Sequence, residues 1–250
     1  MKSRNIVNIL GAQVDLVNNL ESLERIRQFI SDRQTAHVIT LNAEIVYQAQ
    51  QDQALLNIIN GADLVTPDGI GIVWAGNRLG YHFEERVSGI DLLYILCSQA
   101  LQEDWKIYLL GAAPGIAAEA ARQLGITYPG IKICGCHNGY FSADQQEVIL
   151  EEIRSSHPDI LFVALGAPGQ EFWIQKFKKT LEVPVSIGVG GSFDVIAGLK
   201  SRAPGWVISA NLEWLYRLLK EPSRFKRQLA LPKFVLLVLK QSFKRKNNNV

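Results

Sequence analysis

Short apolar runs alternate with amphipathic stretches along most of the chain. Each run has the length of a strand that is buried on both faces, whereas the stretches between them carry apolar residues at helical spacing. The runs that we expect to form strands cover residues 6–10, 37–41, 62–66, 106–110, 131–134, 159–165 and 183–189. The expected helices cover residues 20–30, 43–49, 70–79, 88–102 and 142–155, with an alanine-rich helix after residue 115 and another that ends at residue 179. This alternation predicts an α/β, Rossmann-like fold, in which helices flank a mostly parallel sheet.

Several of the expected strands end in a turn of small and polar residues. These turns read TLN (40–42), TPDG (66–69), GAAPG (111–115), GAPGQ (166–170) and GGSFD (190–194). The carboxyl ends of parallel strands meet at one edge of the sheet, where ligands bind in open α/β folds. Glycine lets backbone amides approach a phosphate, and the start of the next helix favours an anion. Any single short turn needs glycine for its geometry alone, but the set predicts a nucleotide or phosphate cleft.

The turn at residues 66–69 places a single carboxylate at this edge. Pro67 should end the strand because it has no amide for the ladder, and Gly69 permits a sharp exit into the next helix. Asp68 therefore lies just before a helix. From spacing alone, an N-cap of that helix is the simpler interpretation; a role in binding or catalysis becomes the better one when the other turns are considered with it.

The composition fits one large domain or two small ones, with 250 residues of which 48% are hydrophobic. We expect no signal segment at the N-terminus, and no apolar run approaches the roughly 20 residues that a transmembrane helix needs. Three cysteines are an odd number, which argues against a disulfide framework and for a reducing cytoplasm.

Charge is distributed unevenly along the chain. Residues 200–250 hold 12 Lys and Arg against two acids, whereas residues 1–199 hold 14 against 22. A basic C-terminal stretch on an acidic body predicts an anionic partner for that stretch.

Several nucleotide and metal motifs are absent from the sequence. No G-x-G-x-x-G opens a helix after a strand, and no G-x-x-x-x-G-K-[ST] occurs, which argues against dinucleotide-binding oxidoreductases and P-loop NTPases. The four histidines show no metal-ligand spacing, and His37, inside an expected strand, is interpreted as a structural residue with satisfied hydrogen bonds.

Nine blocks of sequence occur together in one order. They are TLNAEIV (40–46), DLVTPDGIGIVW (63–74), ERVSGIDL (85–92), LLGAAPG (109–115), NGYF (138–141), PDILFVALGAPGQEFW (158–173), GVGGSFDVIAG (188–198), RAP (202–204) and LEWLYRL (212–218). Over nearly the whole chain they resemble the WecG/TagA/CpsF family of bacterial glycosyltransferases, glycosyltransferase family 26. The resemblance implies transfer of a sugar, of N-acetylmannosamine type or a related hexose, from a UDP-sugar to an undecaprenyl-diphosphate-linked sugar. It implies inversion and no metal ion or other cofactor, and the chain has no Asp-x-Asp pair. The products would be teichoic acid linkage units or other envelope and exopolysaccharide repeats.

The chain departs from the family pattern at two places. Ala167 and Gly169 stand where other members often carry bulkier residues, and Ser209, Ala210 and Asn211 precede LEWLYRL where a glycine is frequent. These departures leave the chemistry intact and leave the donor sugar open.

The resemblance also implies roles for particular residues. Asp68 would be the general base, Thr40 and Asn42 would hold sugar hydroxyls, Arg86 would stabilise the leaving diphosphate, and Gln170 would orient acceptor or donor. The alternatives are a surface ion pair with Glu84 or Glu85 for Arg86, and a helix cap for Gln170. The residues expected to bind UDP or its diphosphate are Gly111, Tyr140, Gly166, Gly190, Asp194, Arg217, Arg224 and Arg227.

We divide the chain into an α/β catalytic core, residues 1–198, and a basic helical C-terminal appendage, residues 199–250. The apolar stretch at 229–239 is too short to span a bilayer, and basic residues flank it, which is typical of a helix that lies on an anionic membrane surface. The appendage is therefore expected to dock on the membrane and to complete the site, with the protein peripheral on the cytoplasmic face of the plasma membrane. An ordinary packed C-terminal helix with a solvated tail is the alternative.

Two other functions are alternatives to glycosyl transfer. One is another sugar-nucleotide enzyme such as an epimerase, which the missing dinucleotide fingerprint disfavours. The other is a non-enzymatic module whose basic tail binds membrane or nucleic acid, although the chain has no recognised nucleic-acid reader motif. The sequence leaves open which sugar is moved, the polysaccharide pathway and whether the chain forms a homo-oligomer.

Overall fold

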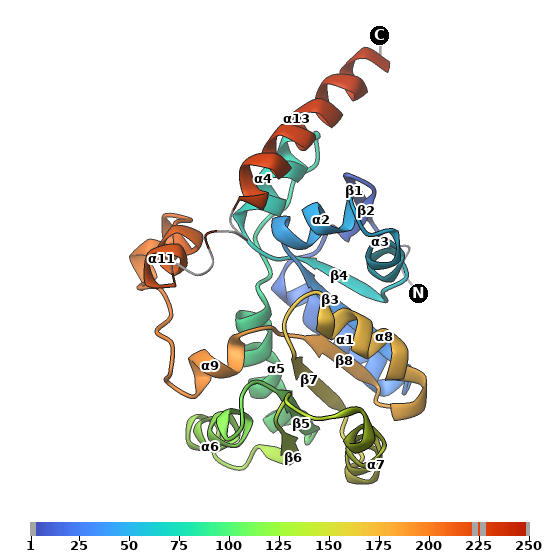
Figure 1. Cartoon of the computed structure of the whole chain (residues 1–250), viewed down its shortest axis with the longest axis vertical. Coiled ribbons are helices and arrows are strands. Elements are labelled where there is room, and N and C mark those ends of the chain that lie inside the picture. The colour runs from blue at the N-terminus through green and yellow to red at the C-terminus, as the bar shows by residue number, and fades with distance from the viewer. Residues whose placement is uncertain (1–3, 222–224, 226–228, 249–250) are drawn as a thin grey trace.

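A six-stranded parallel sheet forms the centre of the molecule. The computed structural model of the chain describes residues 4–221, 225 and 229–248 (Figure 1). The strand order is β4-β3-β8-β7-β5-β6, and every neighbouring pair in this sheet is parallel. The strands are β3 (Ala36–Leu41), β4 (Leu64–Pro67), β5 (Lys106–Gly111), β6 (Lys132–His137), β7 (Ile160–Ala164) and β8 (Val185–Gly188). The predicted α/β fold is confirmed, and the carboxyl ends of all six strands lie at one edge.

Helices cover both faces of this sheet. One face packs against α1 (Asn19–Ser31), α5 (Gly89–Glu103) and α6 (Ile116–Thr127). The other packs against α2 (Ala43–Ala49), α3 (Gln53–Asn60), α7 (Gln146–Ser156) and α8 (Gly169–Leu181). Successive strand residues supply the two cores in turn, so Val38 faces α1 and α5 whereas Ile39 faces α2. Burial on both faces explains why five of these strands read as continuous apolar runs, whereas the edge strand β6 is only partly buried.

The first expected strand lies outside the parallel sheet. Residues Ile6–Ile9 form β1, which pairs antiparallel with β2 (Ala12–Asp15) across a turn in which Gly11 has a φ of 87°. Asp15 is fully buried, accepts a hydrogen bond from the Val65 amide at 2.8 Å, and forms ion pairs with Arg4 and Arg25. The hairpin is thereby attached to the edge strand β4.

Side-chain caps begin several of the helices where the sequence suggests them. Asn18 caps α1 in a capping box with Glu21, and Ser88 caps α5. The helix expected at residues 142–155 begins as the short 3₁₀ helix η1 (Ala143–Gln145), which Ser142 precedes and α7 follows. Two further helices, α4 (Ile70–Arg78) and α9 (Ser192–Ile196), contribute residues to the cavity described below.

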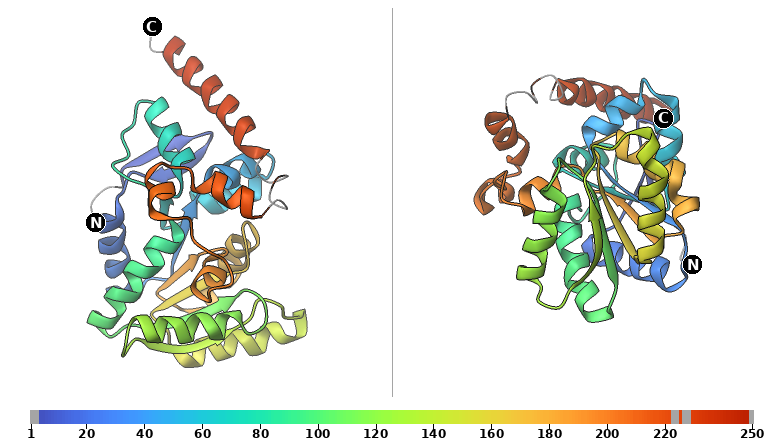
Figure 2. Two further views of the ribbon diagram at one scale, coloured as in Figure 1. Left: turned by 90° about the vertical axis from the view of Figure 1, so that its left-hand side faces the viewer. Right: turned by 60° about the horizontal axis from the view of Figure 1, so that its bottom comes forward.

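The C-terminal segment returns across the core as α10 (Gly205–Ser209), α11 (Glu213–Lys220) and α13 (Ala230–Asn248). Phe234 and Val238 of α13 are buried in the core that α2 and α4 share. On the exposed side of α13, Leu236 is 68% exposed and Phe243 is 60% exposed. Figure 1 and the left view of Figure 2 show the C-terminal end of α13 extending beyond the rest of the molecule. Within the described residues, no helix combines the length and the apolar character that crossing a bilayer requires.

Candidate active site

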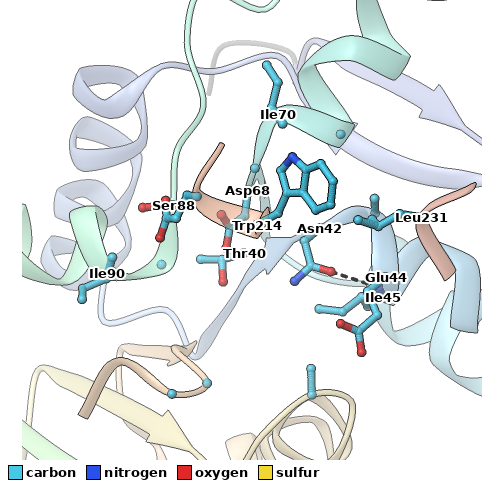
Figure 3. A pocket seen from close by; sticks show the side chains of 18 of the residues that line it. Thr40, Asn42, Glu44, Ile45, Asp68, Ile70, Ser88, Ile90, Trp214 and Leu231 are labelled. Carbon is cyan, nitrogen blue, oxygen red and sulfur yellow. Dashed lines mark hydrogen bonds between the residues drawn. The ribbon is translucent and has the colours of Figure 1, made fainter. Parts of the chain in front are cut away.

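A cavity of about 910 Å³ opens over the carboxyl ends of four neighbouring strands, β4, β3, β8 and β7. Among its lining residues are Asp68 after β4, Thr40 and Asn42 at the end of β3, Gly190 after β8, and Gln170 after β7. Four of the turns that the sequence analysis singled out therefore meet in one place, as parallel strands require. Figure 3 shows Thr40, Asn42 and Asp68 gathered on one side of this cavity.

The opposite wall comes from the C-terminal segment. It contributes charged groups, including Lys200, Arg202 and Glu213, and apolar side chains, including Trp214 and Leu231. Figure 3 shows the indole of Trp214 among the side chains that line the cavity. The cavity thus lies between the edge of the sheet and a segment that begins more than 150 residues later in the chain than Thr40.

Asp68 is positioned by its own backbone. Its amide donates to the carbonyl of Leu41 at 2.9 Å, and the carbonyl of Pro67 accepts from the amide of Val87 at 2.9 Å. The N-cap of α4 is Gly69, with a φ of 82°, and no side chain caps this helix. The interpretation of Asp68 as the N-cap is therefore wrong: its carboxylate lines the cavity one residue before the cap.

Thr40 and Asn42 are each fixed by one hydrogen bond. The Thr40 hydroxyl donates to the carbonyl of Gly188 at 3.1 Å, which ties β3 to β8. Asn42 Oδ1 accepts from the amide of Ile45 at 3.0 Å and so caps α2. Figure 3 shows the Asn42 amide nitrogen on the other side of the amide group from its hydrogen bond with the Ile45 amide. Asn42 combines a capping bond with a donor group at the cavity.

Gln170 is held between a backbone amide and a carboxyl group. Its Oε1 accepts from the amide of Gly190 at 3.0 Å, and its Nε2 donates to Glu171 Oε1 at 2.9 Å. The amide of Gly190 can only donate, so the two partners together fix which end of the Gln170 amide faces which way. A Cβ on Gly188 would lie 2.4 Å from Gln170 Nε2, so any side chain there would have to displace the Gln170 amide. The N-cap of α8 is Pro168 without a side-chain bond, and the cap interpretation of Gln170 is wrong.

Glu171, which the sequence analysis missed, is only 1% exposed. Burial raises the pKa of its carboxyl to about 7, and the hydrogen bond from Gln170 offsets part of that effect. Its second oxygen has no hydrogen-bond partner among the described residues. A glutamate in the first turn of a helix is normally interpreted as an exposed group that favours the helix dipole, and this one is instead part of the support beneath the cavity.

The alternative interpretation of Arg86, a surface ion pair with Glu84 or Glu85, is wrong. Arg86 Nη1 lies 3.0 Å from Oε2 of Glu213, the first residue of α11. Glu84 and Glu85 are engaged elsewhere, because they accept hydrogen bonds from the Asn18 side chain and the Asn19 amide at the start of α1. The nearest carboxylates in the sequence are therefore not the partners of Arg86.

Two further cations line the cavity, and neither was a candidate in the sequence analysis. Lys200 Nζ lies 2.8 Å from Asp194 and 3.6 Å from Glu221. Arg202 forms an ion pair with Asp91, which also accepts a 2.6 Å hydrogen bond from the Ser88 hydroxyl. The RAP block was the available sequence signal for Arg202.

The structure places the remaining candidate residues in three groups. Gly166 and Gly190 line the cavity. Gly111 ends β5 and Tyr140 follows β6, farther along the same edge, and Asp194 is in α9 beside Lys200; none of the three lines the cavity itself. Gly111 has a φ of 131°, and a Cβ there would meet the Ala164 backbone at 2.5 Å. Arg224 and Arg227 lie outside the described residues, as does the side chain of Arg217, whose backbone belongs to α11.

No group of three or more His, Cys, Asp or Glu side chains is arranged to hold a metal ion within the part of the chain that the structure describes. His37 lies in the middle of the fold, fully buried, with neither ring nitrogen hydrogen-bonded to a described residue. It is a structural residue, as expected, but the expectation that its hydrogen bonds are satisfied is wrong.

Comparison with known proteins places the chain in a family. Residues 7–248 match the family model described as the glycosyl transferase WecG/TagA/CpsF family. The chain is 40% identical over 212 residues to an N-acetylglucosaminyldiphosphoundecaprenol N-acetyl-beta-D-mannosaminyltransferase of Bacillus spizizenii, which covers 85% of this chain and 82% of the relative. Relatives of the same name share 35% identity in Bacillus subtilis, covering 98% and 94%, and 36% in Staphylococcus aureus, covering 96% and 94%. The chain therefore belongs to the WecG/TagA/CpsF family of glycosyltransferases.

Proposed function

We propose that this glycosyltransferase moves an N-acetylmannosamine-type sugar from a UDP-sugar to N-acetylglucosamine linked to undecaprenyl diphosphate, with inversion at the anomeric carbon. The names of its relatives support the transferred sugar and the acceptor. The observation that carries the proposal is the position of Asp68, a carboxylate in a cavity at the carboxyl edge of the sheet, with Arg86 lining the same cavity. Family membership sets aside the epimerase-like and the non-enzymatic alternatives.

Transfer with inversion requires one displacement. The Asp68 carboxylate accepts the proton of the acceptor hydroxyl while that oxygen forms a bond to the anomeric carbon. The bond from this carbon to the donor diphosphate breaks, and UDP leaves with the electron pair. A donor with an α-linked sugar would give the β-linkage that the names of the relatives specify. Arg86 would stabilise the charge that develops on the diphosphate.

Other cavity groups fit the two substrates. Thr40 and Asn42 offer polar groups to a sugar, whereas Lys200 and Arg202 add positive charge for a diphosphate. We propose that these cations make a divalent metal unnecessary. The apolar wall that Leu231 and Phe234 contribute from α13 suits the hydrocarbon of the acceptor.

We also propose that residues 199–250 complete the site and bring it to the cytoplasmic face of the plasma membrane. α13 presents exposed Leu236 and Phe243 together with exposed Lys240 and Lys244. Apolar and basic side chains on one exposed helix favour the interface of an anionic membrane. The substrate class supports this placement, because the acceptor named for the relatives is a lipid.

A UDP-release assay with a lipid-diphosphate-N-acetylglucosamine acceptor tests the proposal. Among a panel of UDP-sugars, we expect UDP-N-acetylmannosamine to give the highest rate. Asp68→Asn keeps the shape of the side chain and removes the base, so kcat should fall roughly 10²- to 10⁴-fold while UDP affinity changes little.

Asp104→Asn is the matched control. Asp104 is the left-handed C-cap of α5, where asparagine is well tolerated, and its ion pair with Lys132 is exposed. Turnover near the wild-type rate in Asp68→Asn would reject the base. Absence of UDP release with every donor of the panel would reject the proposed reaction.

A further inference from the structure

The ion pair between Arg86 and Glu213 joins the core to the C-terminal segment at the wall of the cavity. The two residues are 127 positions apart, and both line the cavity. Arg86 belongs to the loop before α5, and Glu213 begins α11. The position of α11 over the site is therefore tied to the orientation of the Arg86 guanidinium.

This pair differs from an ordinary surface ion pair in its burial. The Arg86 side chain is 17% exposed and that of Glu213 is 12% exposed, so solvent screens their attraction poorly. Exposed pairs contribute little to stability, whereas removing one partner of a buried pair leaves an uncompensated charge. Residues 200–250 contain only two acids, Glu213 and Glu221, and both line the cavity.

The geometry of the guanidinium lets it hold two anions at once. Arginine carries five N–H donors in a planar fork. The hydrogen bond to Glu213 uses Nη1, and the other Arg86 nitrogens make no hydrogen bond with a described residue. A carboxylate on one edge fixes the plane of the fork and leaves another edge for phosphate oxygens.

We propose that Glu213 is a positioning residue for the glycosyl transfer: through its ion pair it orients Arg86 toward the donor diphosphate and holds α11 over the cavity. This inference rests on the proposed function, in which Arg86 stabilises the leaving diphosphate. Charge on that diphosphate grows as the sugar is transferred, so a misdirected Arg86 costs more in the transition state than in the bound donor. Loss of the Glu213 charge should therefore lower kcat more than it weakens UDP binding.

Glu213→Gln tests the inference because glutamine keeps the length and one accepting oxygen and removes the charge. We expect kcat with the preferred UDP-sugar to fall roughly 10- to 100-fold, the range of a hydrogen bond to a charged group, while the Kd of UDP changes less than about threefold. Glu213→Asp keeps the charge on a shorter arm and should recover part of the lost kcat. Glu103→Gln is the matched control, since Glu103 pairs with Arg27 at 3.3 Å on the surface and should show wild-type constants.

A double-mutant cycle shows whether Glu213 acts through Arg86. In the Arg86→Gln background, Glu213→Gln should lower kcat by less than about threefold, because the shared interaction is already absent. Equal losses in both backgrounds would overturn the inference, as would wild-type kcat in Glu213→Gln. Tighter UDP binding by Glu213→Gln would overturn it too, because Glu213 would then compete with the diphosphate for Arg86.

The design separates failure of the inference from failure of the proposed function. If Arg86→Gln alone turns over at the wild-type rate, the role of Arg86 in the proposed function is wrong. If Arg86→Gln is impaired and Glu213→Gln is not, the proposed function stands and the positioning role of Glu213 falls. Should Glu213→Gln fail to fold, kcat of Glu213→Asp decides: an intermediate value with unchanged Kd for UDP supports the inference, and wild-type or tighter-binding behaviour contradicts it.

Discussion

Two buried groups should give this protein opposite and nearly cancelling responses to pH. His37 is fully buried, and desolvation, with a smaller effect of the Lys178 charge, lowers its pKa from 6.5 to about 3. The unfolded chain therefore holds one more proton than the native state between these values, and His37 makes stability fall as pH falls. Glu171 behaves in the reverse sense. Burial raises its pKa from 4.5 to about 7, so the native state holds the extra proton and stability falls as pH rises through that window.

The two effects have similar size between pH 7 and pH 5. A difference of one bound proton between the native and unfolded states changes the free energy of unfolding by about 1.4 kcal/mol per pH unit. The difference is less than one proton near the ends of this window, because both groups titrate partly there. Each therefore contributes about 2 kcal/mol over the two units, His37 unfavourably and Glu171 favourably as pH falls. Their sum is close to zero in the wild-type protein.

Removing one group should expose the response of the other. Glu171→Gln keeps an acceptor for Gln170 and loses the titration, so its free energy of unfolding should drop by about 2 kcal/mol more than that of the wild type between pH 7 and pH 5. His37→Leu removes the other titration, so its free energy of unfolding should drop by about 2 kcal/mol less than that of the wild type over the same range. The substitution loses no hydrogen bond to a described residue, because the His37 ring makes none.

Urea denaturation followed by tryptophan fluorescence at pH 5, 6 and 7 measures these free energies. The slope of the unfolding free energy against pH is compared between each variant and the wild type, so the contributions of the other titrating groups cancel. If Glu171→Gln has the same pH dependence as the wild type, the buried carboxyl is ionised in the native state and the argument from desolvation is wrong.

Three further predictions concern the cavity and its C-terminal wall. Gly188→Ala puts a Cβ 2.4 Å from Gln170 Nε2 and should displace that amide, lowering kcat roughly tenfold or more in the UDP-release assay; Gly125→Ala, where nothing lies within 4 Å, should not. Turnover should survive EDTA, and full loss that Mn²⁺ or Mg²⁺ restores would show that the cavity cations are insufficient. The full chain should float with anionic vesicles at low salt, whereas a Leu236→Glu and Phe243→Glu double variant should float less with an unchanged Tm, because both side chains are exposed; equal flotation would remove α13 from the membrane contact.

The part of the fold that follows from sequence is the part with a strong local pattern. The six strands of the sheet are apolar runs bounded by glycine, proline or polar turns, and their existence was predictable from those runs. Strand β2 was missed because AQVD has no such pattern and forms by pairing with β1. Helix α3 was missed because only residues 50–52 separate it from α2, and the cap at Asp52 is the one local sign of a new start.

For the candidate site, the positions of the residues were predictable from the sequence and their partners were not. Asp68, Thr40, Asn42 and Gln170 could be grouped in advance. Each lies at or after the carboxyl end of a strand, and these ends must meet at one edge of a parallel sheet. The partners of these residues could not be predicted. Arg86 has two glutamates immediately before it in the sequence, yet it pairs with Glu213, because the fold brings α11 to the cavity and uses Glu84 and Glu85 at the start of α1.

The structure shows where described basic groups of residues 200–250 lie. The sequence suggests one anionic partner for the basic C-terminal stretch, but two groups among its described charges lie in separate places. Lys200 and Arg202 line the cavity, together with both acids of this stretch, whereas Lys240 and Lys244 lie exposed on α13. A soluble diphosphate should therefore bind near Lys200 and Arg202, whereas an anionic membrane should bind near Lys240 and Lys244. Neutralising Lys240 and Lys244 should weaken vesicle binding and leave the Kd of UDP unchanged, whereas Lys200→Gln should weaken UDP binding and leave flotation unchanged. If either change altered both measurements alike, the two groups of charges would belong to one continuous binding surface.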